Sequence, residues 1–220
     1  ICPGVFSKKT YSVYVTHQLN FSFPFFFQWA AVLAAHVHSR LIHNFQECWI
    51  PDNQNQAWLA GTLSHPAKMP KNARYIGFLS RFHLPQKGIS TMKFPDFQVL
   101  LIASGPQPQR GFFIRKISKI LSKAGIKTLV LAACPESENH EFAEIMPGIF
   151  ECPHLATPDF LCVLLIAGVI ITRSGYSSLM DLAGLNKKVI FILTPGQPEQ
   201  LYLAKYLAKK HAITDRKSVV

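Results

Sequence analysis

The sequence predicts an α/β protein whose main sheet is parallel and carries helices on both faces. Apolar runs of strand length alternate with helical patterns through the second half of the chain, as βαβ units require. These runs are continuously apolar and do not alternate with polar residues, which is typical of strands buried on both faces. With 49% hydrophobic residues among 220, the chain has enough apolar surface for a buried core. We therefore expect a Rossmann-like sheet.

The expected elements of this sheet follow a regular order from Phe97 onward. Strands are expected over 97–104, 128–133, 168–172 and 188–193, with a short apolar segment near 149–152. Helices are expected over 112–123, 158–166, 175–184 and 198–210. In the first of these helices, one apolar stripe is expected to contain Phe113, Ile117, Ile120 and Leu121.

The first part of the chain reads as the remainder of another domain. A strand over 11–16 is followed by a helix over 28–42 and an apolar piece over 48–51. The polar stretch 52–73, punctuated by Gly and Pro, is typical of a linker, and 74–82 of a connecting strand and loop. We predict a domain tail at 1–51, a linker at 52–73 and a second domain at 74–220. Because the chain begins at Ile1, we expect an N-terminally truncated fragment.

The charge balance favours anionic partners. Lys and Arg number 23 against 12 Asp and Glu, a net charge of +11. The basic residues are dispersed, so solvated helix faces are the first interpretation, a peripheral contact with an anionic membrane the second, and nucleic acid a distant third. The uncharged stretch 19–39 resembles a membrane span, but Asn20, Pro24 and Gln28 interrupt it. We expect a loop over 22–27 followed by a helix.

The five cysteines form no CxxC pair, which is typical of reduced thiols in a cytoplasmic protein. His36, His38 and His43 are not accompanied by a Cys or carboxylate that would complete a metal site. The sequence contains no GxSxG, HExxH or Asp-x-Asp motif. We expect no metal and no cofactor.

The loops after the expected strands carry the candidate ligand groups, because ligands of such sheets bind beyond the carboxyl ends of the strands. In "RSGYSSLMD" (173–181), Ser174 stands at the N-cap position and Gly175 permits a tight turn. Free N–H groups there favour a phosphate or diphosphate, and Asp181 could accept hydrogen bonds from ribose hydroxyls. An ordinary capped helix with an exposed Asp181 is equally open. Its apolar stripe would be Tyr176, Leu179, Met180 and Ala183.

Two further loops could contact the same ligand. In "TPGQPEQ" (194–200), Gln197, Glu199 and Gln200 offer groups suited to sugar hydroxyls, although a Pro-rich helix start explains the pattern as well. "SGPQPQRG" (104–111) could bring backbone N–H groups near an anion, with Arg110 as counter-charge. This loop matches neither the Walker A motif nor GxGxxG.

The stretch "ITRSGYSSLMDLAGLNKKVIFILTPGQPEQLYLAKYL" (171–207) resembles the C-terminal domain of glycosyltransferase family 28. The matching positions are Arg173-Ser174-Gly175, Asp181-Leu182 and Pro195 through Gln200. "LLIASGPQPQR" (100–110) resembles the first loop of that domain, and "VTHQLN" (15–20) the end of the family's N-terminal domain. Asp181 stands where the family commonly has Glu, and His17-Gln18-Leu19-Asn20 lacks the carboxylate of the family's His-Glu-Gln-Asn motif.

This resemblance implies a GT-B architecture, in which two Rossmann-like domains enclose the reaction and the C-terminal one, 74–220, binds a UDP-sugar donor. It also implies a role for each candidate residue. The residues implied to bind the donor diphosphate are Ser104, Gly105, Arg173, Ser174 and Gly175. Asp181 is implied to bind the ribose, and Gln197, Glu199 and Gln200 the donor sugar. His17 is implied to act in catalysis on the acceptor side.

The resemblance further implies a bacterial, inverting, metal-independent hexosyltransferase that acts on a carbohydrate or lipid-linked acceptor. Its expected location is the cytoplasm, on the inner face of the membrane, and the isolated fragment is expected to be inactive. Three alternatives stay open: a UDP-sugar 2-epimerase of the same architecture, a non-catalytic nucleotide-sugar-binding subunit with a membrane partner, and a nucleic-acid-binding protein.

Overall fold

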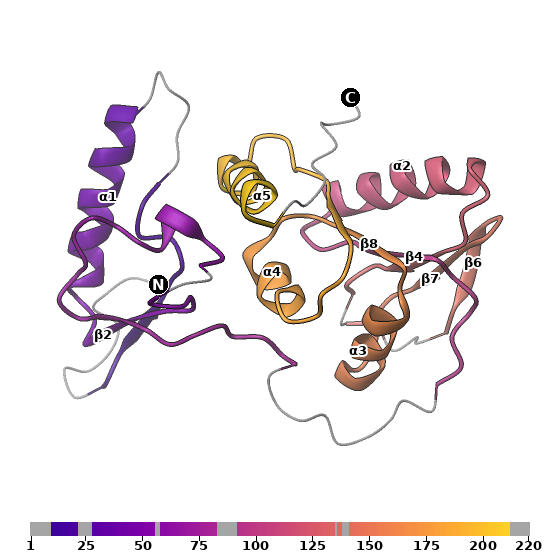
Figure 1. Ribbon diagram of the computed structural model, residues 1–220, viewed down its shortest axis with the longest axis horizontal. Helices are drawn as coiled ribbons and strands as arrows, with labels where there is room; N and C mark the ends of the chain where they lie inside the picture. The colour runs from indigo at the N-terminus through magenta and orange to yellow at the C-terminus, as the bar shows by residue number, and fades with distance from the viewer. Residues whose placement is uncertain are drawn as a thin grey trace.

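The computed structural model describes residues 10–21, 28–55, 58–82, 92–134, 136–137 and 141–211. They form a small sheet and a large sheet, with two helices, α4 (Tyr176–Leu182) and α5 (Pro198–His211), between them (Figure 1). The loop expected over 22–27 lies outside the described residues. None of the helices in the described ranges is long and apolar enough to cross a membrane.

The large sheet has six strands in the order β6-β7-β5-β4-β8-β9, and all neighbours are parallel except β6 and β7. The strands are β4 (Val99–Ile102), β5 (Thr128–Leu131), β6 (Ala143–Met146), β7 (Ile149–Cys152), β8 (Val169–Thr172) and β9 (Val189–Phe191). The central strands β4 and β5 are buried at every position, as their continuous apolar sequences predict. The antiparallel edge strand β6 was not predicted. Its first three residues are exposed, so its sequence lacks the continuous apolar run from which a buried strand is predicted.

Helices cover both faces of this sheet, which confirms the predicted architecture. They are α2 (Gln109–Lys123), α3 (Thr157–Ile166), α4 (Tyr176–Leu182) and α5 (Pro198–His211). The helix α2 packs through Phe113 and Leu121 on one face, and α3 packs through Val163 and Leu164 on the other (Figure 1). One position of the predicted α2 stripe is wrong: Ile120 is 46% exposed, because it faces away from the sheet.

The small sheet consists of three parallel strands in the order β1-β2-β3, with α1 (Gln28–Ile42) beside it. The strands are β1 (Val13–Val15), β2 (Glu47–Ile50) and β3 (Ala73–Tyr75). Because β3 pairs with β2, this sheet extends past the residues expected to form a linker. The division of the chain at residues 51 and 73 stays a prediction.

The segment expected to be a linker is folded around a buried carboxylate. Asp52 is fully buried and accepts hydrogen bonds from the backbone N–H groups of Asn53, Leu59 and Ala60 and from the hydroxyl of Ser64. A short 3-10 helix, η2 (Gly61–Leu63), follows. Four partners for one carboxylate explain how so polar a stretch becomes ordered.

This folded segment holds the small sheet against the large one. Leu59, Ala60 and Leu63 belong to the same hydrophobic cluster as residues of α4 and α5. The Tyr202 hydroxyl of α5 accepts a hydrogen bond from Thr62 N at 2.8 Å. The small sheet therefore lies next to the helices that follow β8 and β9, where the sequence places the candidate ligand groups.

Candidate functional site

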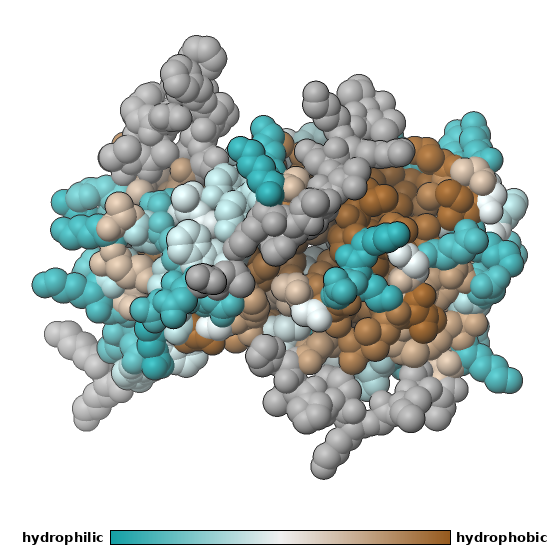
Figure 2. All heavy atoms as spheres, viewed as in Figure 1, coloured by the Kyte–Doolittle hydropathy of each residue, from teal (hydrophilic) through white to brown (hydrophobic). Residues whose placement is uncertain are grey.

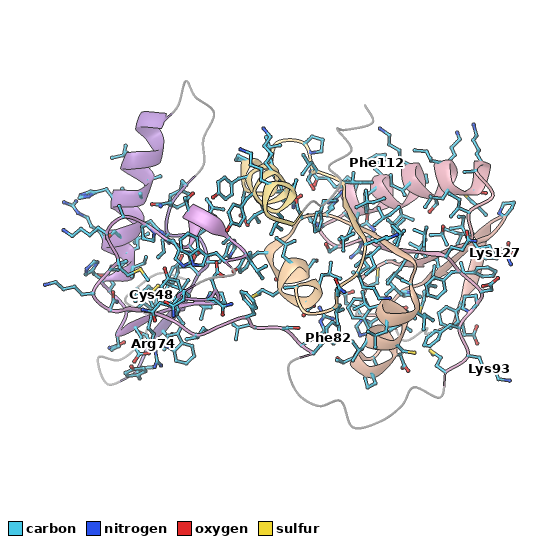
Figure 3. All side chains as sticks on the ribbon, in the orientation of Figure 1. Cys48, Arg74, Phe82, Lys93, Phe112 and Lys127 are labelled. Carbon is cyan, nitrogen blue, oxygen red and sulfur yellow. The ribbon has the colours of Figure 1, made fainter. Side chains whose placement is uncertain are left out.

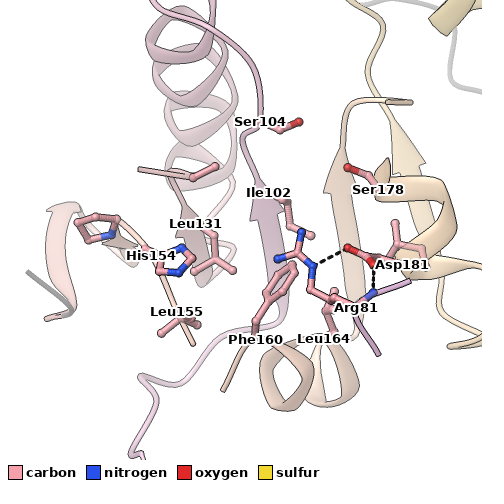
Figure 4. A pocket seen from close by; sticks show the side chains of 13 residues that line it. Arg81, Ile102, Ser104, Leu131, His154, Leu155, Phe160, Leu164, Ser178 and Asp181 are labelled. Atoms are coloured by element: carbon pink, nitrogen blue, oxygen red, sulfur yellow. Dashed lines mark hydrogen bonds and ion pairs between the residues drawn. The ribbon is translucent and has the colours of Figure 1, made fainter. Parts of the chain in front are cut away.

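A partly open pocket lies beyond the carboxyl ends of β4, β5 and β7, beside α3 and α4 (Figure 4). Its cavity volume is about 120 Å³, and one side of it opens to solvent. In the large sheet, β4 lies between β5 and β8, so the strand order reverses at this point, which is where open α/β sheets bind ligands. Its lining residues are Arg81, Ile102, Ser104, Leu131, Ala133, Pro153, His154, Leu155, Phe160, Leu164, Ser178, Asp181 and Leu182.

The pocket has an apolar part and a polar part. Leu131, Leu155 and Phe160 form an apolar wall, whereas Ser104 and Ser178 lie together near its other end, with Asp181 beside Arg81 (Figure 4). Of the residues that the sequence singled out, the structure thus brings Ser104 and Asp181 to one pocket. An apolar wall with a few polar groups is the usual composition of a ligand site.

Asp181 is buried, which excludes the interpretation that it is an exposed residue of an ordinary helix. Its Oδ1 accepts hydrogen bonds from Ser80 Oγ and Arg81 N, and its Oδ2 accepts one from Arg81 Nε at 2.8 Å. The guanidinium of Arg81 also lies 5.1 Å from the ring centre of Phe160, a cation–π contact. Sequence reasoning missed Arg81, because it lies 100 residues before its partner in a segment without a motif.

Arg173 is a buried residue that organises the loop after β4. Its Nη1 lies 3.5 Å from Ser104 O and its Nη2 donates to Gln109 O at 3.0 Å, while its guanidinium stacks over Phe113. Burial lowers the pKa of this guanidinium below its ordinary value. Gly105 adopts φ +110°, and a Cβ there would meet Arg173 Nη1 at 3.0 Å. This loop therefore needs a glycine beside the arginine.

The structure corrects the expected start of α4. Gly175 is the N-cap and no side chain caps the helix, so the prediction that Ser174 is the cap is wrong. Ser174 is fully buried instead, and its hydroxyl donates to Gln200 O at 2.9 Å. Ala183, expected in the apolar stripe, is exposed, whereas Tyr176, Leu179 and Met180 are buried as predicted.

Arg110 and Gln200 are also engaged within the protein. Arg110 donates to Ala133 O and to Cys134 Sγ, and so does not supply the expected counter-charge to loop 104–111. Gln200 Oε1 accepts a hydrogen bond from Thr194 N at 3.3 Å. Gln197 is exposed at the start of α5. Of the three expected sugar ligands, Gln197 keeps an exposed side chain, whereas Glu199 pairs with His17.

His17 and Glu199, predicted for different roles, form a pair. Glu199 Oε1 lies 2.8 Å from His17 Nε2, and the His17 ring stacks on Tyr176 with ring centres 3.9 Å apart. Burial raises the pKa of the Tyr176 hydroxyl above its usual range, so this group stays protonated and donates to Pro51 O. His17 thus lies at the starts of both α4 and α5, between the small sheet and the large sheet.

Two findings concern metals and thiols. In the part of the chain that the structure describes, no three His, Cys, Asp or Glu side chains gather closely enough to hold a metal ion.

Cys48 and Cys152 are buried thiols, and Cys134 and Cys162 are half-buried thiols. Burial raises the pKa of Cys48 to about 11, which makes this thiol unreactive at neutral pH.

The fold is that of an α/β protein with a pocket beyond the carboxyl ends of its strands, and it can be compared with known proteins. A crystal structure described as that of "the Glycotransferase of kitacinnamycin" superposes with a TM-score of 0.57 at 12% sequence identity. The superposition covers 94% of this chain and 58% of that structure, so the chain spans little more than half of its length. This likeness confirms the GT-B-like fold.

A family model matches part of the sequence. Residues 158–215 match the family model described as "Glycosyltransferase family 28 C-terminal domain". This part of the chain is therefore similar to the C-terminal domain of glycosyltransferase family 28, in agreement with the resemblance at 171–207. A search among curated proteins gave no match.

Proposed function

We propose that this chain is the donor-binding part of a glycosyltransferase and that the pocket holds the nucleotide of a UDP-sugar. The observation that supports this most is the composition of the pocket at the point where the strand order reverses: an apolar wall, two serines, and the Asp181–Arg81 pair. The family match at 158–215 contains five of the thirteen lining residues, which come from α3 and α4: Phe160, Leu164, Ser178, Asp181 and Leu182.

The nucleoside fits the apolar end of the pocket in this proposal. The base packs against Phe160 and Leu155, and Asp181 accepts hydrogen bonds from the ribose hydroxyls. Asp181 is one methylene shorter than the Glu common in the family, and the donors that hold it, Ser80 and Arg81, come from the segment between β3 and β4. Ribose binding therefore requires the carboxylate to share its oxygens with Arg81.

The diphosphate takes the polar end of the pocket. The hydroxyls of Ser104 and Ser178 and the backbone at Gly105 offer donors there, and Arg81 supplies a positive charge. Arg173 acts through the loop, since its guanidinium donates to the carbonyl of Gln109 and approaches that of Ser104. Fixed donors and cationic groups then stabilise the departing diphosphate, with no metal and no cofactor in the proposed reaction.

The proposed reaction is a direct displacement with inversion. An acceptor hydroxyl oxygen forms a bond to the anomeric carbon, the bond from that carbon to the β-phosphate oxygen breaks, and UDP leaves with the electron pair. His17 takes the acceptor's proton on Nδ1, while Glu199 holds Nε2 and thereby fixes which nitrogen can act as base. Gln197, at the start of α5, contacts the donor sugar.

The setting of this activity is also a proposal. The acceptor is a carbohydrate or lipid-linked hydroxyl compound, and the enzyme transfers a hexose in the cytoplasm. The free thiols of the four described cysteines support a reducing compartment. An epimerase would convert UDP-N-acetylglucosamine without an acceptor, so product analysis with this donor alone separates the two activities.

Calorimetric titration of the chain with UDP, ADP and GDP tests the donor site. We expect UDP to bind at least tenfold more tightly than the other two, and Asp181→Asn to weaken UDP binding about tenfold, because a charge-assisted hydrogen bond is worth roughly 1.5–3 kcal/mol. Asp96→Asn, an exposed carboxylate that pairs with Lys127, is the control. Failure of a folded chain to bind any nucleotide would refute the proposal.

A further inference from the structure

The helix α2 has an unusual charge pattern that the donor site does not use. Its 15 residues include five basic side chains and no Asp or Glu. Arg110 turns inward to Ala133 and Cys134. The other four, all exposed, are Arg115, Lys116, Lys119 and Lys123.

The same outward face carries exposed apolar side chains. Phe112 is 61% exposed and Ile120 is 46% exposed, whereas Phe113 and Leu121 are buried against the sheet. Figure 3 shows Phe112 near the start of α2 on its outer side, and Figure 2 shows apolar surface over α2 bordered by hydrophilic side chains. Arg115 lies 5.4 Å from the ring centre of Phe112. Aromatic, aliphatic and cationic groups thus share one surface, here called the α2 face: Phe112, Arg115, Lys116, Lys119, Ile120 and Lys123.

Three of the cationic groups on this surface are not neutralised within the described ranges. Arg115, Lys119 and Lys123 form no ion pair with any residue in the described ranges. An amphipathic helix with basic residues beside exposed Phe and Ile is suited to an anionic lipid surface, where the cations meet headgroups and the apolar side chains enter the acyl boundary. A nucleic acid would use the cations but gain little from an exposed isoleucine, which cannot stack on a base.

We propose that the α2 face docks the protein on an anionic membrane surface. This inference goes beyond the proposed donor site and does not depend on it. It does place that site close to the lipid: α2 begins at Gln109, whose carbonyl accepts a hydrogen bond from Arg173, and Phe112 follows one turn later. A donor loop so close to the headgroups suits an acceptor that is itself anchored in lipid.

Vesicle sedimentation tests this docking with the full chain. We expect binding to phosphatidylcholine vesicles that contain about 30% phosphatidylglycerol, and none to pure phosphatidylcholine, because cations near an anionic surface drive the attraction. Lys119→Gln combined with Lys123→Gln should weaken binding about 30-fold, as two lost charges predict. Lys205→Gln with Lys209→Gln, an equal change of charge on exposed positions of α5, should change it less than about threefold.

A second pair of variants tests the apolar contribution. Phe112→Ser should weaken binding about tenfold, since an exposed ring would lose its burial in the acyl boundary. Leu165→Ser, at a 51% exposed position of α3, should leave it unchanged. Circular dichroism verifies that every variant is folded.

Three results would overturn the proposal. The first is that folded wild-type chain binds no anionic vesicle, and the second is that the α2 and α5 lysine pairs weaken binding equally. The third is binding to single-stranded RNA, weakened by the α2 lysine pair, without vesicle binding. That result would assign the α2 face to nucleic acid.

Discussion

At the scale of single residues, the pocket is defined by a pair that no motif indicates. Arg81 and Asp181 are 100 positions apart, yet Arg81 donates to the carboxylate through both its backbone N–H and its Nε. The side chain of Asp181 is 9% exposed and that of Arg81 49%, so the arginine can adjust to a ligand while the carboxylate stays in place. We regard Arg81 as the adaptable part of the site.

Arg81→Gln tests this view. The variant should bind UDP about tenfold more weakly, because a charge-assisted contact to the diphosphate is lost, and uridine with less than about a threefold change. Parallel calorimetric titrations with UDP and uridine measure the difference. Arg74→Gln, an arginine of β3 that pairs with Glu47, is the matched control. Equal losses for UDP and uridine would show that Arg81 acts only by ordering Asp181.

A second residue-scale prediction concerns pH. Burial raises the pKa of Glu151 on β7 above its ordinary value of 4.5. Since the folded state then binds the proton more tightly than the unfolded state, Glu151 favours folding below pH 4.5, and this contribution is lost as the pH rises through the raised pKa.

Glu151→Gln should therefore raise the melting temperature at pH 7 and leave it unchanged near pH 4. Thermal denaturation at the two pH values measures this. Glu136→Gln, at an exposed position, should have no effect at either pH. A destabilising effect of Glu151→Gln at pH 7 would mean that the charged carboxylate is favourable in the fold.

At the scale of elements, the segment between β2 and β3 is held by a single carboxylate. Asp52 accepts four hydrogen bonds while fully buried. The segment in turn places Leu59 and Leu63 against α4 and α5. Its order therefore depends on one side chain more than on an apolar core of its own.

Asp52→Ala should lower the free energy of unfolding by more than about 3 kcal/mol, because several buried donors lose their partner at once. Urea denaturation monitored by tryptophan fluorescence measures the change. Asp96→Ala, which removes an exposed carboxylate, should cost less than about 1 kcal/mol. A small effect of Asp52→Ala would indicate that water satisfies these donors.

The elements themselves could largely be predicted from the sequence, because buried parallel strands and amphipathic helices have local patterns. The strands β4, β5, β8 and β9 and the helices α1 to α5 lie within a few residues of their expected ranges. The edge strand β6 and the strand β3 were less accessible to prediction, because each is short and partly exposed.

The site could be predicted only in part. The loops were located correctly, since they follow from strand order, but side-chain partners depend on tertiary contacts. Ser174 donates to a carbonyl of α5 and does not cap α4, and Glu199 meets a histidine 182 positions away. Such contacts leave no periodic signal in the sequence.

At the scale of the whole molecule, His17 and Glu199 connect the small sheet to the helices of the large sheet. His17 follows β1, and Glu199 lies in α5. Because an ionised carboxylate only accepts hydrogen bonds, the neutral imidazole should carry its proton on Nε2. Long-range proton–nitrogen correlation spectra identify the protonated nitrogen. Glu199→Gln should weaken this preference, because an amide can also donate, whereas Gln197→Ala should preserve it. Protonation of Nδ1 in the wild type would contradict the proposed role of Glu199.

The most direct test of the donor site is a crystal structure of the chain with UDP. We predict the base against Phe160 and Leu155, the ribose hydroxyls on Asp181, and the diphosphate between Ser104 and Ser178. UDP bound elsewhere, with the Asp181–Arg81 pair intact and the pocket without nucleotide at saturating UDP, would contradict the assignment.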